Sequence, residues 1–466
     1  MKITHILYSL CVVAVCSACS DYLDIKPHGR TVPKTSEEFA ALLHTHLNRI
    51  DLGEDPYLVG NTGRWLLLDA TCGDDFETCL TEGTGRSLGA YVGDAITASA
   101  DTYRNLYAII RDCNIVINEM KETGEQADQL RSVAHAIRGA SYYQLMRFFC
   151  EVPSKQPRNQ PGLPLVMTFD PEERPLRSDL QATIDFIESD FVKALQHPTT
   201  NAIYRFNEDV IKGYRTRFYF WTKQWDAALT LAQELLQKHP LLQGDAYKKM
   251  MTSPHELVGN QLLKAYRIIN SSSGEGLSDS QQTISSRPVS ARFLEAFSST
   301  EKEKDIRYTL WVNSKRRSIK TFFCGMRAAE FKLIQAECLY HLGKQNEALQ
   351  AINDLRAHRI DGHTPYTLAN LPAPSSKEII KTDAQGVALT PLLALILQER
   401  RKELFLEGDR FFEQKRNGAP EYWTAFNGLK YVTRSYMYTF PIPLRDIELV
   451  GQGLKQNPGY TETESN

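Results

Sequence analysis

Two short segments far apart in the sequence repeat one helix–turn–helix pattern, and this repeat restricts the fold more than any other feature. The run Lys-Gln-Trp-Asp-Ala at 223–227 aligns without gaps with Lys-Gln-Asn-Glu-Ala at 344–348. Each run follows an apolar-aromatic helical pattern (211–221 and 328–342) and precedes an amphipathic one (227–237 and 348–355). Helix pairs of this kind are typical of tetratricopeptide units of about 34 residues. Because one pair cannot bury its apolar face alone, we expect further pairs stacked against it.

Most of the remaining chain is also predicted to be helical. Apolar residues at helical spacing predict helices over 101–121 and 127–149, and Ser36 is the predicted N-cap of a helix over 36–50. The pattern is lost over 57–96, residues 271–283 are low in apolar side chains, and 308–312 has a strand-like pattern. We therefore predict a mostly α fold, a tetratricopeptide-like helical-repeat scaffold with an inserted irregular, loop-rich ligand-binding part and a few short strands.

One domain over 19–466 accommodates this organisation. The predicted helical repeats occupy roughly 101–238 and 324–418, the loop-rich binding parts roughly 51–100 and 270–323, and a C-terminal segment 419–466.

The N-terminus carries the pattern of an export signal. Lys2 precedes an apolar run over 6–15, which is too short for a permanent transmembrane helix. Cys19 directly follows Ser17-Ala18, as in a lipobox, where the cysteine is acylated after cleavage, although Cys16 stands where such boxes usually have leucine. We expect residues 1–18 to be a lipoprotein signal peptide and Cys19 to carry the lipid (palmitate) anchor; a plain secreted protein is the alternative.

The net charge restricts the possible binding partners of the protein, and the positions of the cysteines suggest their roles. Lys and Arg number 54 against 56 Asp and Glu, a net charge of -2, which gives no general attraction to nucleic acid or anionic membrane. In an oxidising envelope Cys72 and Cys79 could close a small disulfide ring. The cysteines within helical patterns are instead expected to be buried small hydrophobes; these are Cys113, Cys150, Cys324 and Cys338.

Several longer motifs occur in order along nearly the whole chain. They are Cys-Ser-Asp-Tyr-Leu-Asp-Ile-Lys-Pro at 19–27, Arg-Ala-Ala-Glu at 327–330, Gln-Ala-Glu at 335–337, Asn-Glu-Ala-Leu at 346–349, Ile-Leu-Gln-Glu-Arg-Arg-Lys-Glu-Leu at 396–404, Glu-Gly-Asp-Arg-Phe-Phe at 407–412, Phe-Pro-Ile-Pro at 440–443 and Gln-Asn-Pro-Gly-Tyr at 456–460. With these motifs the chain resembles the SusD/RagB family of outer-membrane lipoproteins.

The resemblance implies a lipid-anchored outer-membrane protein, exposed at the cell surface, that pairs with a TonB-dependent transporter (a SusC-like β-barrel). Such a protein captures an oligosaccharide and delivers it to the transporter without being an enzyme. The RagB branch of the family implies an oligopeptide ligand as the alternative, and an exported hydrolase is a less favoured one. The scarcity of aromatic residues over 271–283 departs from larger members of the family and places ligand contacts from that stretch in question.

The charged motif on the predicted helix over 396–404 resembles a catalytic site, but we interpret its charges as structural ion pairs. Glu399 and Glu403 share one helix face, with arginines beside them, and such clusters more often join helices than transfer protons. No His-Glu-x-x-His helix, Gly-x-Ser-x-Gly elbow or phosphate-binding glycine loop occurs in the sequence. We predict no catalytic residues and no cofactor. Asp74, Asp75 and Glu77 could hold Ca²⁺ through oxygen atoms, with an ordinary acidic loop as the alternative.

Sugar recognition needs flat aromatic faces beside planar polar groups. The first loop-rich region supplies Trp65, Asp74, Asp75, Arg86 and Tyr91 as candidate ligand contacts, and the second supplies Tyr308 and Trp311. Trp65 and Trp311 are the first choices because each lies in polar, loop-like sequence. The alternative for every aromatic residue is a place in the core.

Overall fold

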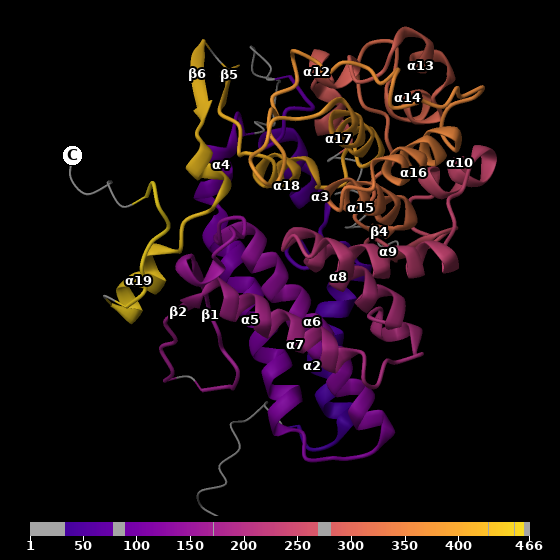
Figure 1. Cartoon of the computed structure of the whole chain (residues 1–466). Coiled ribbons are helices and arrows are strands. Elements are labelled where there is room, and N and C mark those ends of the chain that lie inside the picture. Colours follow the sequence, from indigo (N-terminus) through magenta and orange to yellow (C-terminus); the bar gives the residue numbers. More distant parts are fainter. Residues whose placement is uncertain are drawn as a thin grey trace, which may run out of the picture.

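Pairs of helices stacked side by side form the scaffold of the computed structural model (Figure 1). The structure describes residues 33–77, 89–170, 172–268, 281–426, 428–451 and 453–460. The predicted signal peptide and the predicted lipidation site Cys19 therefore lie outside the described residues. The α-helices are α2 Ser36–Asp51, α3 Thr62–Trp65, α4 Val92–Thr97, α5 Ser99–Glu119, α6 Glu125–Phe149, α7 Leu180–Ala194, α8 Glu208–Trp221, α9 Trp225–Lys238, α10 Gly244–Thr252, α12 Ala291–Leu294, α13 Ser299–Lys304, α14 Ile306–Trp311, α15 Ala328–His341, α16 Gln345–Ala357, α17 Pro391–Glu403, α18 Arg410–Arg416 and α19 Leu444–Val450.

The helix contacts follow one continuous path through the scaffold. Helix α5 packs on α6, α6 on α7 and α8 on α9, and α9 then packs on α15 although a long inserted segment separates them in sequence. Helix α15 contacts both α16 and α17. The helices expected over 101–121 and 127–149 are confirmed as α5 and α6, and the helix expected over 36–50 is confirmed as α2. Its N-cap is Thr35 rather than Ser36, because the Thr35 hydroxyl accepts from the backbone N–H of Glu38.

The internal repeat is confirmed as two helix pairs, α8–α9 and α15–α16, but the predicted register is one residue off. The tight turn takes a positive φ at Lys223 (62°) in the first pair and at Gly343 (77°) in the second. Lys223 is thus the structural equivalent of Gly343, not of Lys344. With this shift, buried positions of α9 match buried positions of α16, Ala228 with Ala348 and Leu235 with Leu355. The turn conformation, not the similarity of the letters, sets the alignment.

Short strands join segments that are distant in sequence. Within the described residues they form three two-stranded antiparallel sheets: β1 Pro161–Pro164 with β2 Arg177–Asp179, β3 Gln261–Lys264 with β4 Gly325–Arg327, and β5 Tyr422–Phe426 with β6 Leu429–Thr433. The β3–β4 pair closes the base of the inserted segment by joining its two ends. Within that segment the strand expected over 308–312 is wrong, because 306–311 forms helix α14. The described parts of the region over 57–96, residues 57–77 and 89–96, are also more regular than expected, with α3, a π-helix at Leu66–Thr71 and the start of α4.

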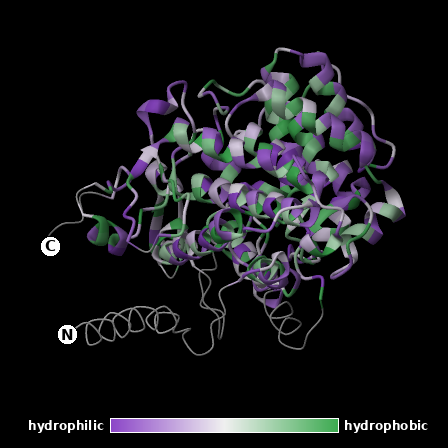
Figure 2. Cartoon of the chain, turned by 90° about the horizontal axis from the view of Figure 1, so that it is seen from below, coloured by the Kyte–Doolittle hydropathy of each residue, from purple (hydrophilic) through white to green (hydrophobic). Residues whose placement is uncertain are grey.

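Hydrophobic residues gather between the helices, while hydrophilic residues prevail along the outer edges (Figure 2). The cysteines expected to be small hydrophobes are confirmed as buried: Cys113, Cys150, Cys324 and Cys338. Within the described ranges, no helix combines the length and the apolar character needed to cross a membrane.

Charged residues of α17 are buried at the centre of the molecule, which confirms their structural role. Glu399 and Glu403 are both fully buried. Glu399 accepts from Arg307 (2.8 Å) and Arg356 (2.5 Å), and Glu403 accepts from Arg327 (2.6 Å). These carboxylates join α17 to α14, α16 and β4, so they hold elements together and do not face a substrate.

Candidate ligand-binding site

The first-choice residues of the sequence prediction, Trp65 and Trp311, are both core residues. Each is 1% exposed. The Trp65 indole N–H donates to the carbonyl of Leu406, and its ring meets Phe322 edge-on. The Trp311 ring lies 4.5 Å from the Lys320 ammonium. The expectation that these two indoles offer exposed faces to a ligand is therefore wrong, because both faces are covered by protein.

Asp74 and Asp75 are also buried, and arginines already occupy their carboxylates. Asp74 accepts from Arg410 (2.7 Å), and Asp75 accepts from Arg401 (2.7 Å). Burial alone would raise the pKa of Asp74, but Arg401 and Arg410 outweigh it and lower the pKa below its usual value. The two aspartates connect this segment to α17 and α18, so the expectation that they contact ligand is corrected to a structural role. Among the described residues, no group of three His, Cys, Asp or Glu side chains is placed to hold a metal ion.

Of the other residues predicted to contact ligand or to form a disulfide, some are partly buried and others lie outside the described residues. Tyr91 is partly buried, with its ring 5.0 Å from Tyr431 of β6. Tyr308 is partly buried against Phe297, 5.2 Å away. Arg86 and Cys79 lie outside the described residues, so the role of Arg86 and the Cys72–Cys79 disulfide stay predictions. Cys72 itself is buried, and burial raises the pKa of its thiol.

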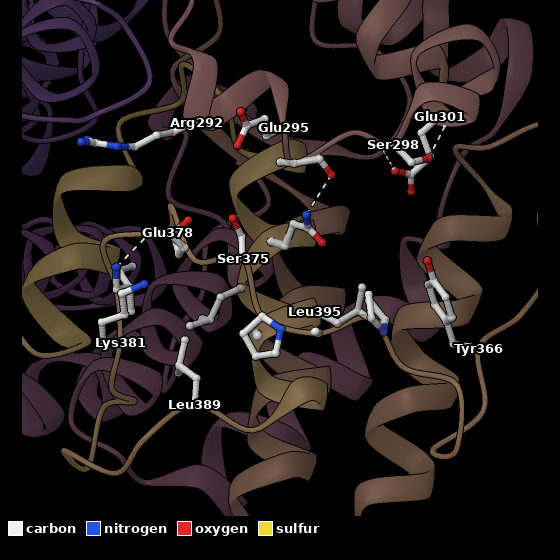
Figure 3. Close-up of a pocket in the computed structure, with 18 of the residues that line it drawn as sticks. Arg292, Glu295, Ser298, Glu301, Tyr366, Ser375, Glu378, Lys381, Leu389 and Leu395 are labelled. Atoms are coloured by element: carbon white, nitrogen blue, oxygen red, sulfur yellow. Dashed lines mark hydrogen bonds between the residues drawn. The ribbon is translucent and has the colours of Figure 1, made fainter.

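A cavity of about 470 Å³ lies in another place, between α12–α13, α17 and the segment that connects α16 to α17 (Figure 3). Its volume falls within the range of ordinary small-molecule sites. We call it the Tyr366 pocket. It is lined by Arg292, Glu295, Ala296, Ser298, Glu301, Arg356, Tyr366, Pro372, Ala373, Pro374, Ser375, Glu378, Ile380, Lys381, Ala388, Leu389, Ala394, Leu395, Leu397, Gln398 and Arg410.

The aromatic wall of the pocket is held in place from helix α16. Asn353 forms two hydrogen bonds with the backbone of Tyr366, accepting from its N–H (2.9 Å) and donating to its carbonyl (2.8 Å). The guanidinium carbon of Arg356 lies 4.8 Å from the centre of the Tyr366 ring. These contacts fix an aromatic face at one end of the pocket before any ligand arrives. The apolar side chains Leu389 and Leu395 line the same pocket.

The two ends of the pocket differ in chemistry. Figure 3 shows Tyr366 and Glu301 on one side and Arg292, Glu378 and Lys381 on the other. Glu378 accepts from Arg401 (2.9 Å) and Arg410 (2.7 Å). Burial would raise its pKa, but the two arginines lower the pKa well below its usual value. Glu378 therefore stays ionised and is not a candidate proton donor.

A surface depression continues from the charged end toward the β5–β6 hairpin. It shares Arg292, Glu378 and Lys381 with the pocket and also includes Glu421, which immediately precedes β5. Two residues further along, Trp423 is 57% exposed. The Tyr422 hydroxyl donates to the carbonyl of Cys72 (3.0 Å), so the alternation of side chains along a strand turns Trp423 away from the body of the protein.

Sequence reasoning missed both aromatic faces. The hairpin does have a sequence signal, since Asn427-Gly428 separates two runs with alternating side chains. No comparable signal marks Tyr366, because the pocket is assembled from three segments that are far apart in the chain.

The structure is that of a helical-repeat protein with a preformed cavity, and comparison with known proteins identifies its family. A model of the SusD family matches residues 304–460, and a second model, described as starch-binding associating with outer membrane, matches residues 21–220. The chain belongs to the SusD/RagB family, as its motifs predicted. None of the curated proteins gives a significant match.

Solved structures share the fold at low sequence identity. A SusD superfamily protein from Bacteroides thetaiotaomicron VPI-5482 aligns with a TM-score of 0.68 and 19% identity, over 91% of this chain and 100% of the other. A SusD-like carbohydrate binding protein from Bacteroides vulgatus ATCC 8482 gives 0.63 and 17%, over 91% and 98%. A laminarin binding SusD-like protein gives 0.58 and 16%, over 92% and 100%. The predicted mostly α helical-repeat fold is confirmed.

Proposed function

We propose that this protein is a non-enzymatic, surface-exposed outer-membrane lipoprotein that captures an oligosaccharide and delivers it to a TonB-dependent transporter. Membership of a family whose model is described as starch-binding and associated with the outer membrane supports this function. Attachment through Cys19, the single domain over 19–466 and the β-barrel partner belong to the proposal.

The observation that carries the proposal is one aromatic face inside a preformed cavity and a second, exposed aromatic residue close in sequence to the depression that continues from that cavity. Tyr366 lines the pocket, and the depression that leaves its charged end runs to Glu421, two residues before the exposed Trp423. Aromatic faces bind the apolar sides of pyranose rings, while planar charged groups bind their hydroxyls. An extended saccharide can therefore contact Tyr366 at one end and Trp423 at the other.

The acidic residues of the pocket argue against hydrolysis. A glycosidase needs one carboxylic acid that is protonated near neutral pH and a second carboxylate free to act. Glu378 is held ionised by Arg401 and Arg410, and Glu301 is paired with Arg356 (2.8 Å) and Lys402 (3.2 Å). Ion pairs thus occupy these carboxylates.

Binding of a panel of plant and algal oligosaccharides to the purified protein, measured by isothermal titration calorimetry, tests the proposal. We expect saturable binding, with the saccharide recovered at its original length. Tyr366→Ala and Trp423→Ala should each weaken the affinity about two- to tenfold, the range of a lost aromatic contact. Phe169→Ala is the matched control, since Phe169 is 49% exposed and does not line the pocket.

Two results would contradict the proposal. Shortened products would favour a hydrolase, and binding of oligopeptides in place of saccharides would favour the RagB-like alternative.

A further inference from the structure

The Tyr366 pocket has more positive charge than its own acidic residues neutralise. Its three carboxylates each have a cationic partner: Glu295 pairs with Lys377 (2.5 Å), Glu301 with Arg356 (2.8 Å) and Glu378 with Arg410 (2.7 Å). Arg356 and Arg410 are further engaged with Glu399 and Glu413, respectively. The three carboxylates and these two arginines therefore already have partners of opposite charge within the protein.

Two other cations that line the pocket, Arg292 and Lys381, take no part in these ion pairs. Arg292 has a side chain that is 38% exposed, and its one ion pair among the described residues is a long contact of 3.9 Å to Asp74. That carboxylate also pairs with Arg401 (3.1 Å) and Arg410 (2.7 Å). The Arg292 guanidinium consequently retains much of its capacity to bind an anion.

Lys381 is exposed, and its ammonium donates to the backbone carbonyl of Ser376 (3.0 Å). Within the part of the chain that the structure describes, no carboxylate lies within ion-pair distance of it. A carbonyl group orients the ammonium without neutralising it, so its positive charge is available to a ligand.

Both cations stand where the pocket meets the depression that leads to the hairpin. Arg292 and Lys381 line both hollows, and Figure 3 shows them on the same side of the pocket as Glu378. A ligand that extends from Tyr366 toward Trp423 passes this junction. A neutral saccharide would cover two cations whose charge is only weakly paired (Arg292) or unpaired (Lys381), whereas an anionic group would pair with both.

We propose that the ligand is an anionic oligosaccharide, and that Arg292 and Lys381 bind its carboxylate or sulfate group at the junction. This inference rests on the proposed function and specifies the class of saccharide. Arg292 supplies a planar fork that matches an oxyanion, and Lys381 supplies a point charge. A free inorganic anion would not use the aromatic ring of Tyr366 or the apolar side chains of Leu389 and Leu395, which also line the pocket.

The test compares three probes of related size by isothermal titration calorimetry: a galacturonic acid oligosaccharide, its fully methyl-esterified neutral form, and a sulfated galactose oligosaccharide. The first and third probes distinguish a carboxylate from a sulfate as the preferred anion. We expect at least one anionic probe to bind about tenfold or more tightly than the neutral ester, and its affinity to fall with added NaCl.

Variants then assign the charge preference to the two cations. Arg292→Gln and Lys381→Gln should each weaken the anionic probe about three- to tenfold, the range of a partly exposed charged hydrogen bond. Each should weaken binding of the neutral ester less than binding of the anionic probe, so that the difference in affinity between the two probes becomes smaller. Arg292→Lys should retain part of the affinity because it keeps the charge. Arg104→Gln is the control, since Arg104 pairs with Asp101 on the exposed face of α5.

The outcomes separate this inference from the proposed function. If the neutral ester binds as tightly as the anionic probes, or if Arg292→Gln and Lys381→Gln leave the anionic affinity unchanged, the inference is wrong while saccharide capture stands. If neither these probes nor any saccharide of the panel binds, or if a glutamate oligopeptide binds in their place, both are wrong.

Discussion

Replacement of Glu403 by glutamine removes the carboxylate on which three buried arginines converge. Glu403 is fully buried and accepts from Arg327 (2.6 Å), Arg359 (2.9 Å) and Arg307 (3.2 Å). Burial would raise its pKa, but the three guanidinium groups lower the pKa far below its usual value, so the carboxylate is ionised at neutral pH. A glutamine side chain at this position would keep the shape of the site and one acceptor oxygen but lose the negative charge.

The expected cost follows from those three contacts. Hydrogen bonds to charged groups contribute about 1.5–3 kcal/mol each, and an amide oxygen replaces part of them. Breaking a buried ion pair by removing one partner costs about 3–5 kcal/mol, and we expect Glu403→Gln to lower the free energy of unfolding by that amount. Urea unfolding followed by circular dichroism measures the loss.

An exposed ion pair provides the comparison. Asp101 and Arg104 lie 2.7 Å apart, with side chains that are 59% and 72% exposed, so Asp101→Asn should change the free energy of unfolding by less than about 0.5 kcal/mol. If Glu403→Gln costs no more than Asp101→Asn, the buried ion pairs of α17 do not stabilise the fold as expected.

Substitutions in the repeat turn and a fall in pH below about 4.5 should both change the free energy of unfolding. Both repeat turns hold a positive φ, and a Cβ at Gly343 would meet no atom within 4 Å, so only the backbone conformation should matter there. In thermal melts, Gly343→Ala should lower the free energy of unfolding by about 1 kcal/mol, and Lys223→Gly should raise it by up to about 1 kcal/mol. A Gly343→Ala variant as stable as the wild type, together with a destabilised Lys223→Gly variant, would contradict the corrected register. Burial raises the pKa of Glu337, but Arg416 and His341 outweigh it and lower the pKa from the usual 4.5 to about 2, so the unfolded chain binds more protons than the folded one in this range. Stability should fall as pH drops from about 4.5 toward 2, by up to about 3 kcal/mol from this group, and urea midpoints across that range should fall less steeply for Glu337→Gln than for the wild type; parallel curves would contradict the assignment.

The helical scaffold could be predicted from the sequence because its signals are local. Apolar residues at helical spacing are enough to locate α5 and α6, and the repeated turn locates α8–α9 and α15–α16. The register of the repeat was predicted one residue off, because Lys223 adopts a positive φ that is uncommon for a lysine and has no signal in the sequence.

The candidate site could not be predicted because it depends on contacts between distant residues. Trp65 and Trp311 have polar neighbours in sequence, and polar sequence suggested exposure. Those neighbours are themselves buried: Arg64 donates to Gln144 (2.9 Å), and Arg307 donates to Glu399 (2.8 Å). Since these partners lie 80 and 92 residues away in the sequence, local composition suggested exposure where the structure shows burial.

The most direct test of the central claim is a crystal structure of the protein with the oligosaccharide that it binds most tightly. We predict a sugar ring against the face of Tyr366, an anionic group within hydrogen-bond distance of Arg292 and Lys381, and a chain that extends toward Trp423. A saccharide bound on another surface, with the Tyr366 pocket left empty, would contradict the account.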